Sequence, residues 1–546
     1  MFIFLIFLIK YYFLILKKLD NIDVLYSLLN INNQRLEIIA QEQIFSDILN
    51  FVSISQSSDQ ITSLPSKILD RFCISILSRI HKNVKSLILE SVSMKYILRA
   101  GNYPNLTQLK LFNFTKAIFS RYFIDDFLFG HICKQQITDL VLVVNENNIE
   151  ITEEDYTKNV YAIILDFFEN VKHLTIAMPS TKHYSGSTTS YPCLSLYKLP
   201  PMTFSSSTLT KLCINVHDIN DVRSLLDGRL KQLTTLIVQV EFIMDLRSTS
   251  YNRDDLPNLK CFSLTSYNFT QEYDNLIIPL LRRMSHLEEL TLNILIFDRS
   301  TLITGTHLDN EILIHMPRLH TFIFCIISET AITDPAIRIS NDDIERTFSN
   351  LKHQQVACMV DYFIPLKMVC RVFSLPFKFD RLEHVTNNIP NIVFKSVTRL
   401  NLWDKDPFKH EFFVRLTRAF PFLKKLSIWN IQAPFSTFDE RHLSDKDWCS
   451  IVEYPHLISL DVARANTHYV EHFLNETKTH LPHLTELKVT YDDLEIVTKN
   501  FTRDETRRSC AGVKRLIVEG PINYSNDVYN YFPLFHDAKN ASRLLR

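Results

Sequence analysis

The chain has 546 residues, of which 46% are hydrophobic and 22% are charged, a composition typical of a folded protein rather than a disordered one. Lys and Arg together number 59 and Asp and Glu 60, so the chain lacks the excess positive charge of proteins that bind nucleic acids. Only seven glycines are present, and no glycine-rich phosphate-binding loop can be written. We therefore expect neither a nucleic-acid partner nor a cofactor.

The first 16 residues are almost wholly apolar, with Lys10 in their middle and Lys17 and Lys18 at their end. A membrane span needs about twenty apolar residues. A signal peptide needs a basic start, a shorter apolar core and a small-residue cleavage site. Because the segment fits neither pattern well, a buried helix and a membrane anchor remain alternative interpretations.

The residues that follow predict short amphipathic helices. Asp20 or Asn21 can cap a second helix, in which Ile22, Leu25 and Leu28 share one face. Two or three such helices have more apolar surface than the first 50 residues can bury alone, so the segment is expected to have a partner.

The run from Lys17 to Asn32, KKLDNIDVLYSLLNIN, resembles the second half of an F-box. This small helical module stands at the N-terminus of substrate receptors of SCF-type ubiquitin ligases. An F-box usually opens with Leu-Pro-x-Glu, whereas the matching place here, Phe7 to Tyr12, has neither the proline nor the acidic residue. The resemblance implies an all-α module over residues 1–52 that docks the F-box-binding adaptor of cullin–RING ligases. The residues expected to face that adaptor, or else to pack inside the module, are Leu16, Leu19, Ile22, Val24, Leu25 and Leu28.

A polar segment at residues 53–60 predicts a linker, and apolar spacing then predicts a helix over residues 67–81. From there one phrase recurs: apolar, two residues, apolar, one residue, apolar. Most successive copies start 22–38 residues apart, which suits one strand plus one helix or loop per unit. The fourteen copies start at Val84, Leu106, Ile137, Val171, Leu209, Leu233, Leu259, Leu287, Leu319, Val397, Leu423, Leu457, Leu484 and Val513.

This repetition predicts an α/β fold: a right-handed, leucine-rich-repeat-like solenoid of fourteen to sixteen strand–helix units over residues 61–523, followed by a cap or tail at 524–546. It resembles the irregular repeat region of one large family of F-box proteins. Helical spacing is clear at residues 272–284, 409–420 and 470–480. The 78-residue interval between Leu319 and Val397 is expected to hide one or two degraded units, with candidate strands at 355–359 and 379–385.

The residues on either side of the middle apolar residue of each phrase are expected to face away from the core, on the concave side of the array. Their mixture of charges with Thr and Ser suits a protein surface better than a small apolar ligand, although much of this face could be merely solvated sheet. The candidate substrate contacts are Lys110, His173, Lys211, Glu289, Arg399, Lys425, Lys488 and Arg515.

One stretch, His468-Tyr-Val-Glu471-His472, matches the His-x-x-Glu-His signature of inverted zincins. Two histidines four residues apart share one side of a helix, as a zinc site requires. The other interpretation is an ordinary turn of a repeat helix, because no downstream acidic residue stands out as third ligand. We favour this second interpretation and expect neither catalysis nor a metal.

Ten cysteines are scattered without Cys-x-x-Cys spacing, which predicts no disulfide framework and a reducing compartment, the cytoplasm or the nucleus. The resemblance implies a non-catalytic substrate receptor that holds a protein substrate for ubiquitin transfer. The alternative is a membrane-anchored or secreted leucine-rich-repeat binding protein that uses residues 1–16 as anchor or signal.

Overall fold

The computed structural model describes residues 13–29, 31, 33–54, 61–124, 134–144, 152–177, 192–196, 199–200, 202–244, 256, 258–332, 338–349, 355–363, 367–433, 451–518 and 526–535. The chain forms two compact units, residues 1–296 with 308–322 and residues 297–307 with 323–546. Each unit is described by itself.

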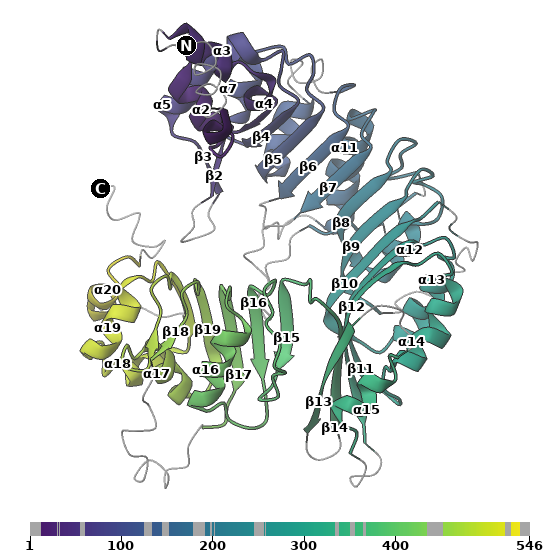
Figure 1. Ribbon diagram of the computed structural model, residues 1–546, viewed down its shortest axis with the longest axis vertical. Helices are drawn as coiled ribbons and strands as arrows, with labels where there is room; N and C mark the ends of the chain where they lie inside the picture. The colour runs from purple at the N-terminus through teal and green to yellow at the C-terminus, as the bar shows by residue number, and fades with distance from the viewer. Residues whose placement is uncertain are drawn as a thin grey trace, which may run out of the picture. The chain divides into compact units, whose positions relative to one another are not determined.

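The protein has a mixed α/β fold with a large, mostly parallel sheet (Figure 1). This sheet has twelve strands in the order β1-β4-β5-β6-β7-β8-β9-β10-β11-β12-β14-β13, so that from β4 to β12 the strands are neighbours in the order of the sequence. The strands from β1 to β11, apart from the last residues of β11, belong to the first unit. Their bounds are β1 Ile48–Asn50, β4 Ser86–Glu90, β5 Gln108–Phe114, β6 Asp139–Val144, β7 His173–Ala177, β8 Lys211–Asp218, β9 Thr235–Phe242, β10 Cys261–Thr270 and β11 Glu289–Arg299.

The repeated phrase sets the register of this sheet. From β4 to β11, the middle apolar residue of each copy lies opposite its equivalent on the next strand, and every one is at most 1% exposed. A one-residue slip would turn this whole row towards solvent, so burial fixes the register. The row consists of Leu87, Leu109, Leu140, Leu174, Leu212, Leu236, Phe262 and Leu290.

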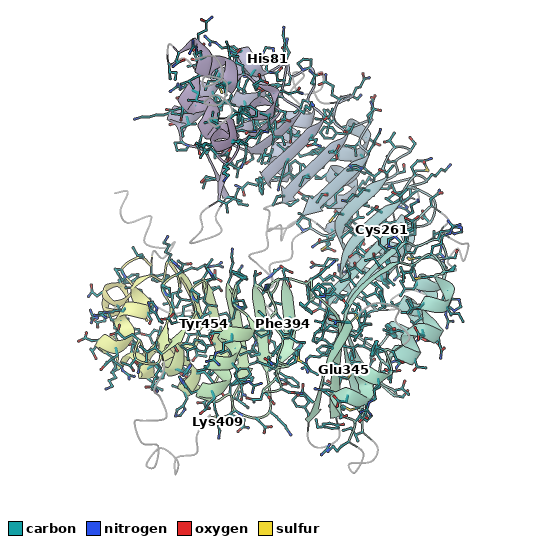
Figure 2. The ribbon with its side chains drawn as sticks, viewed as in Figure 1. His81, Cys261, Glu345, Phe394, Lys409 and Tyr454 are labelled. Atoms are coloured by element: carbon teal, nitrogen blue, oxygen red, sulfur yellow. The ribbon has the colours of Figure 1, made fainter. Side chains whose placement is uncertain are left out.

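Short helices follow most strands of the first unit. The helix predicted over residues 67–81 is confirmed, with a π-helical turn in its middle, and so is the helix predicted over 272–284. His81, just after the first of these helices, is labelled in Figure 2. The segments are α5 Ser66–Arg71, η1 Phe72–Ile76, α6 Leu77–Ile80, α7 Met94–Arg99, α8 Lys116–Phe119, η2 Ser120–Ile124, α10 Glu153–Tyr156, η3 Thr157–Tyr161, α11 Ala162–Phe167, α12 Ile219–Leu225, η4 Tyr273–Ile277 and α13 Ile278–Arg282.

The first 52 residues differ from the expected all-α module. Helices α2 (Asn21–Leu28), α3 (Gln34–Ala40) and α4 (Gln43–Ser46) are present, and the Asp20 side chain caps α2 by accepting a hydrogen bond from the Ile22 N–H. However, β1 follows directly and pairs with β4. The reason is that Leu49 lies opposite Leu87 and is fully buried, so this segment starts the apolar row of the sheet.

The segment predicted as a linker, residues 53–60, falls on a hairpin. Strand β2 (Val52–Ile54) pairs antiparallel with β3 (Ile61–Ser63), and residues 55–60 between them lie outside the described residues. Residues 1–12 of the proposed anchor also lie outside the described part, while residues 13–16 are helical. Within the described part of the chain, no helix combines the length and the apolar character needed to cross a bilayer.

The second unit contains an antiparallel group, formed by β12 (Thr321–Ala331) apart from its first two residues, β14 (Lys367–Leu375) and β13 (Gln355–Phe363). It also contains a six-stranded parallel sheet in the order β15-β16-β17-β19-β21-β22. The repeated phrase again sets the register there, with a buried row of Leu382, Leu400, Leu426, Leu460, Leu487 and Leu516. The strands are β15 Arg381–Val385, β16 Arg399–Trp403, β17 Lys425–Asn430, β19 Ser459–Ala465, β21 Glu486–Val489 and β22 Arg515–Val518.

Both candidate segments in the interval between Leu319 and Val397 form strands, but of different kinds. Residues 379–385 contain β15, which pairs in parallel with β16 as a repeat unit should. Residues 355–359 begin β13, which pairs antiparallel with β14. Only three residues connect β13 to β14, and so short a connection can join antiparallel strands but not parallel ones.

Helix α15 (Asn341–Arg346) lies along β13, the last strand of the twelve-stranded sheet (Figure 1). Two of its side chains take hydrogen bonds from the strand: Cys358 N–H donates to Glu345 Oε1 at 3.1 Å, and Val360 N–H donates to Asn341 Oδ1 at 2.9 Å. Figure 2 shows Glu345 at this place. The helix thereby satisfies backbone groups that an edge strand would otherwise leave unpaired.

Two of the remaining helices of the second unit were predicted, and one of them has different bounds from those expected. The helix predicted over 409–420 is α16 (His410–Ala419). The helix predicted over 470–480 is α17, which begins earlier, at Thr467, because Asn466 caps it, and ends at Leu474. Thr479 and His480 instead form a short strand, β20, paired with β18 (Val452–Glu453). The other helices of this unit are α18 Tyr491–Thr498, α19 Asp504–Ala511 and α20 Asn526–Tyr531. Helix α14, Gly305–Glu311, is divided between the two units, and η5, Leu313–His315, belongs to the first.

The expected C-terminal cap begins with α20. Its Val528 and Tyr531 are buried with the core of the second unit, and Tyr531 Oη donates to the Arg503 carbonyl at 2.6 Å. Residues 536–546 lie outside the described residues.

Candidate functional site

Along each strand of the parallel sheets, the residues that alternate with the buried row lie on the other side of the sheet, which we call the open face. In the first unit, the two open-face positions that flank the row are half-buried or exposed on every strand from β5 to β11. The face is mostly polar, as predicted from the repeated phrase. Its fourteen positions are Gln108, Lys110, Asp139, Val141, His173, Thr175, Lys211, Cys213, Thr235, Ile237, Cys261, Ser263, Glu289 and Thr291.

Four of the candidate substrate contacts lie on this face. His173 and Lys211 are opposite each other on β7 and β8, and the His173 Nδ1 atom is 2.6 Å from Asp139 Oδ1 on β6. Glu289 is exposed at the equivalent place on β11. Lys110 stands above the ring of Phe112, with its Nζ 4.7 Å from the ring centroid. The face therefore presents cationic and anionic side chains in one register row.

The β2–β3 hairpin packs on the first strands of the open face. Its Val52 belongs to an apolar cluster with Phe112 and Val143, and Ile61 packs against the same group. Half-buried Ile88, Val141 and Ala177 of β4, β6 and β7 complete the cluster. This contact was not predicted, because the polar residues 53–60 are typical of a linker.

Glu90, at the end of β4, fastens the hairpin to the sheet. Its carboxylate accepts hydrogen bonds from Ser63 Oγ of β3 at 2.7 Å, Ser91 Oγ at 2.8 Å, Val92 N–H at 2.9 Å and Asn113 Nδ2 of β5 at 3.1 Å. Burial raises the pKa of this carboxyl, but the four hydrogen bonds outweigh it and hold the pKa below its usual value.

Glu90→Ala is expected to lower the free energy of unfolding by about 2–3 kcal/mol, because it leaves several half-buried donors without their acceptor. Because the folded pKa is depressed, the stabilising contribution is present above the unfolded pKa of 4.5 and is lost as the pH falls through the folded value. Glu90→Gln should therefore be less stable than wild type at pH 7 and approach it at acidic pH. Urea unfolding followed by circular dichroism measures this, and a pH-independent difference would contradict it.

The open face of the second unit is more buried than that of the first unit, and more of its charged side chains form ion pairs. Lys488 Nζ lies 3.4 Å from Asp461 Oδ2, and Arg515 Nη1 lies 2.9 Å from Glu486 Oε2. Both pairs join neighbouring strands. The other two candidate contacts of this unit, Arg399 and Lys425, are half-buried register partners on β16 and β17, and Arg399 pairs with Asp380.

The six candidate adaptor contacts fall into two groups. Ile22, Val24 and Leu25 of α2 are at most 4% exposed, which corresponds to internal packing. Leu19 is 51% exposed, and Leu16 and Leu28 are half-buried. Further apolar side chains are exposed nearby in sequence: Leu14, Ile15, Ile31, Ile38, Ile44 and Ile48.

The zinc-like motif lies on α17, where its residues have structural partners. His472 is 5% exposed and stacks on Phe413 with the ring centroids 4.6 Å apart, and burial lowers its pKa to about 3. Glu471 Oε1 instead pairs with Lys478 at 3.5 Å and Arg503 at 3.3 Å. These contacts match the interpretation as a repeat helix.

A different group of side chains, which was not predicted from the sequence, does come together. Among the described residues, one set of three or more His, Cys, Asp or Glu side chains lies close enough to hold a metal ion: Glu153, His217 and Glu241. His217 and Glu241 each stand eight residues after the start of their phrase, at Leu209 and Leu233. That equal offset is a signal that could have placed them side by side.

Neither the family models nor the curated proteins contain a match to this chain. The eight cysteines within the described ranges, among them Cys261 of β10 (labelled in Figure 2), are all free thiols.

Proposed function

We propose that this protein is a substrate receptor of an SCF-type ubiquitin ligase, with an F-box-like N-terminus and a leucine-rich-repeat-like, right-handed solenoid. Its N-terminal helices would dock the ligase adaptor, and its open faces would hold a target protein. Its role would then be positional, with the chemistry supplied by other subunits.

The observation that carries the binding role is the open face of the first unit. The hydrogen-bonded register places equivalent side chains of successive strands next to one another. Each strand therefore adds two positions, at which the residue type can vary, to a continuous surface. The row containing Asp139, His173, Lys211 and Glu289 mixes both signs of charge. Such a surface suits a partner with a complementary charge pattern, because complementary charges give specificity and speed association.

The adaptor role rests on the exposed apolar side chains around the start of α2. Leu14, Ile15 and Leu19 are each more than half exposed and lie within six residues of one another. Large apolar side chains that gather on a surface mark a site of protein association. The buried Ile22, Val24 and Leu25 of α2 would hold this surface in place rather than contact the adaptor.

A pull-down against the F-box-binding adaptor tests the adaptor role. Deletion of residues 1–50 is a poor variant, because it removes β1 from the sheet. Ile15→Glu with Leu19→Glu changes only exposed side chains, so it should reduce adaptor retention at least about tenfold while the fold is kept. The matched control is Ile496→Glu on α18, another apolar residue that is 65% exposed. Full retention by the double variant, or no retention by the wild type, would rule out this docking surface.

A further inference from the structure

The group formed by Glu153, His217 and Glu241 lies at the carboxyl ends of two parallel strands. His217 is on β8 and Glu241 on β9, and the flanking register pairs, Val216 with Val240 and Asp218 with Phe242, place the two residues opposite each other. Both belong to the open face, since they alternate with the buried residues of their strands. The carboxyl edge of parallel strands is a common position for ligand sites in α/β proteins.

Glu153 reaches the same point from α10. Its Oε2 atom lies 2.7 Å from His217 Nδ1, and Glu241 Oε2 lies 3.7 Å from the same nitrogen. The three ligand atoms lie within 4.8 Å of one another. One imidazole nitrogen therefore faces two carboxylates that come from different parts of the chain.

A fourth possible ligand comes from the short segment 192–196. Leu194 forms a parallel bridge with Val216, and His217 N–H donates to the Leu194 carbonyl at 3.0 Å, which fixes this segment beside β8. The neighbouring Cys193 is 7% exposed, and its Sγ lies 3.9 Å from Glu241 Oε2. A thiol at this distance makes at most a weak hydrogen bond.

The contact between His217 and Glu153 does not explain the group by itself. Glu153 Oε2 lies 2.7 Å from His217 Nδ1 and accounts for one carboxylate, but Glu241 Oε2, at 3.7 Å, is beyond ordinary hydrogen-bond distance of that nitrogen. The arrangement thus gathers two carboxylates and the nearby Cys193 thiol around one imidazole.

We propose that Glu153, His217, Glu241 and Cys193 bind one divalent cation of the zinc class. Carboxylate oxygen, imidazole nitrogen and thiolate sulfur are the ligand types that zinc accepts in a four-coordinate site. With metal–ligand bonds of about 2.0–2.3 Å, the ligand atoms of a tetrahedral site lie about 3.3–3.8 Å apart. The contact at 3.7 Å falls within this range, the contact at 3.9 Å lies just above it and would close slightly, and the contact at 2.7 Å would open.

The cation would join four segments that are remote in sequence: α10, the segment 192–196, β8 and β9. Two further acids in this region have other roles. Asp218 and Asp221 form a capping box at the start of α12, and Asp221 Oδ1 also accepts the Leu196 N–H at 2.8 Å. This inference does not depend on the ligase proposal, because the site needs no adaptor or target protein.

The test is isothermal titration of the full-length, chelator-treated protein with ZnCl₂. We expect the wild type to bind one zinc ion per chain. His217→Ala should lower the affinity for this ion about 100-fold, and Glu153→Gln and Glu241→Gln should each lower it at least about tenfold, since each variant removes one ligand. His173→Ala is the matched control. It removes another histidine that contacts a single carboxylate on the same sheet, at 2.6 Å.

Circular dichroism of each variant shows whether it is folded, and cobalt(II) provides a second readout. Cobalt bound to the wild type should give the intense visible bands of a tetrahedral site and a thiolate charge-transfer band, and Cys193→Ser should lose the latter. The proposal is overturned if the wild type takes up no zinc. It is equally overturned if the folded His217→Ala and Glu241→Gln variants bind zinc as the wild type does.

Discussion

Asp361→Ala is expected to lower the free energy of unfolding of the second unit by about 3–5 kcal/mol, because it leaves the fully buried guanidinium of Arg371 without its counter-charge. Arg371 reaches from β14 to Asp361 of β13 and donates a second hydrogen bond to the His384 carbonyl. An arginine cannot shed its charge, so the variant has to bury an unpaired cation. Urea unfolding followed by tryptophan fluorescence measures the loss, since all three tryptophans, at 403, 429 and 448, belong to this unit.

Two further variants separate the contribution of the charges from that of side-chain packing. Arg371→Met alone should cost less than Asp361→Ala, because a buried carboxyl can take up a proton and burial already raises the pKa of Asp361. Combining Asp361→Leu with Arg371→Met removes both charges and should restore most of the stability. If the double variant were as unstable as Asp361→Ala, packing rather than charge would be the cause.

Phe394→Ala is expected to cost about 3–5 kcal/mol, since it opens a cavity in an aromatic cluster of the same unit. Phe394 is fully buried, and Figure 2 shows it beside β15 and β16. Its ring stacks on Phe420 at 4.9 Å and meets Phe377 edge-on at 5.3 Å and Phe373 at 5.8 Å. The same fluorescence-detected unfolding measures the change.

Phe394→Leu serves as the control for cavity size, and it should cost clearly less than the alanine variant because it fills most of the space. Phe422→Ala is the control for losing a phenylalanine as such, since Phe422 is 47% exposed. An equal loss in Phe394→Ala and Phe422→Ala would contradict the assignment of Phe394 to the core.

The strands and their register could be predicted from the sequence because one physical constraint repeats. Leu109, Leu140 and Leu174 recur with the same spacing around them, and each has to be buried against its neighbour. The helices at 272–284 and 409–420 were predictable for the same reason, since their apolar residues recur with helical period. Of the fourteen phrase starts, all are buried except Leu319, which is half-buried.

The remaining features depend on contacts between residues far apart in sequence, which a local hydrophobic pattern does not predict. Ser63 meets Glu90 across 27 residues, and neither belongs to the repeated phrase. Met359 lies on an apolar segment that suits a parallel or an antiparallel strand equally, and only the short connection to β14 decides between them. The motif at His468 and His472 was interpreted from the sequence as a turn of a repeat helix, and on α17 His472 packs on Phe413 while Glu471 pairs with Lys478 and Arg503.

The candidate metal ligands illustrate a third limit. His217 and Glu241 share an offset within the repeat, so the register could have paired them. Glu153 and Cys193 come from segments outside that register, and only the folded chain brings them to the same place.

The helix beside β13 also bears on self-association. A strand of nine residues at the end of a sheet is a template on which a second chain could add its own strand. Here Asn341 and Glu345 already occupy the Val360 and Cys358 N–H groups that an incoming strand would need. At the opposite end of the same sheet, β1 is only three residues long and offers little to pair with. The twelve-stranded sheet is thus protected at both ends against growing from one molecule into the next.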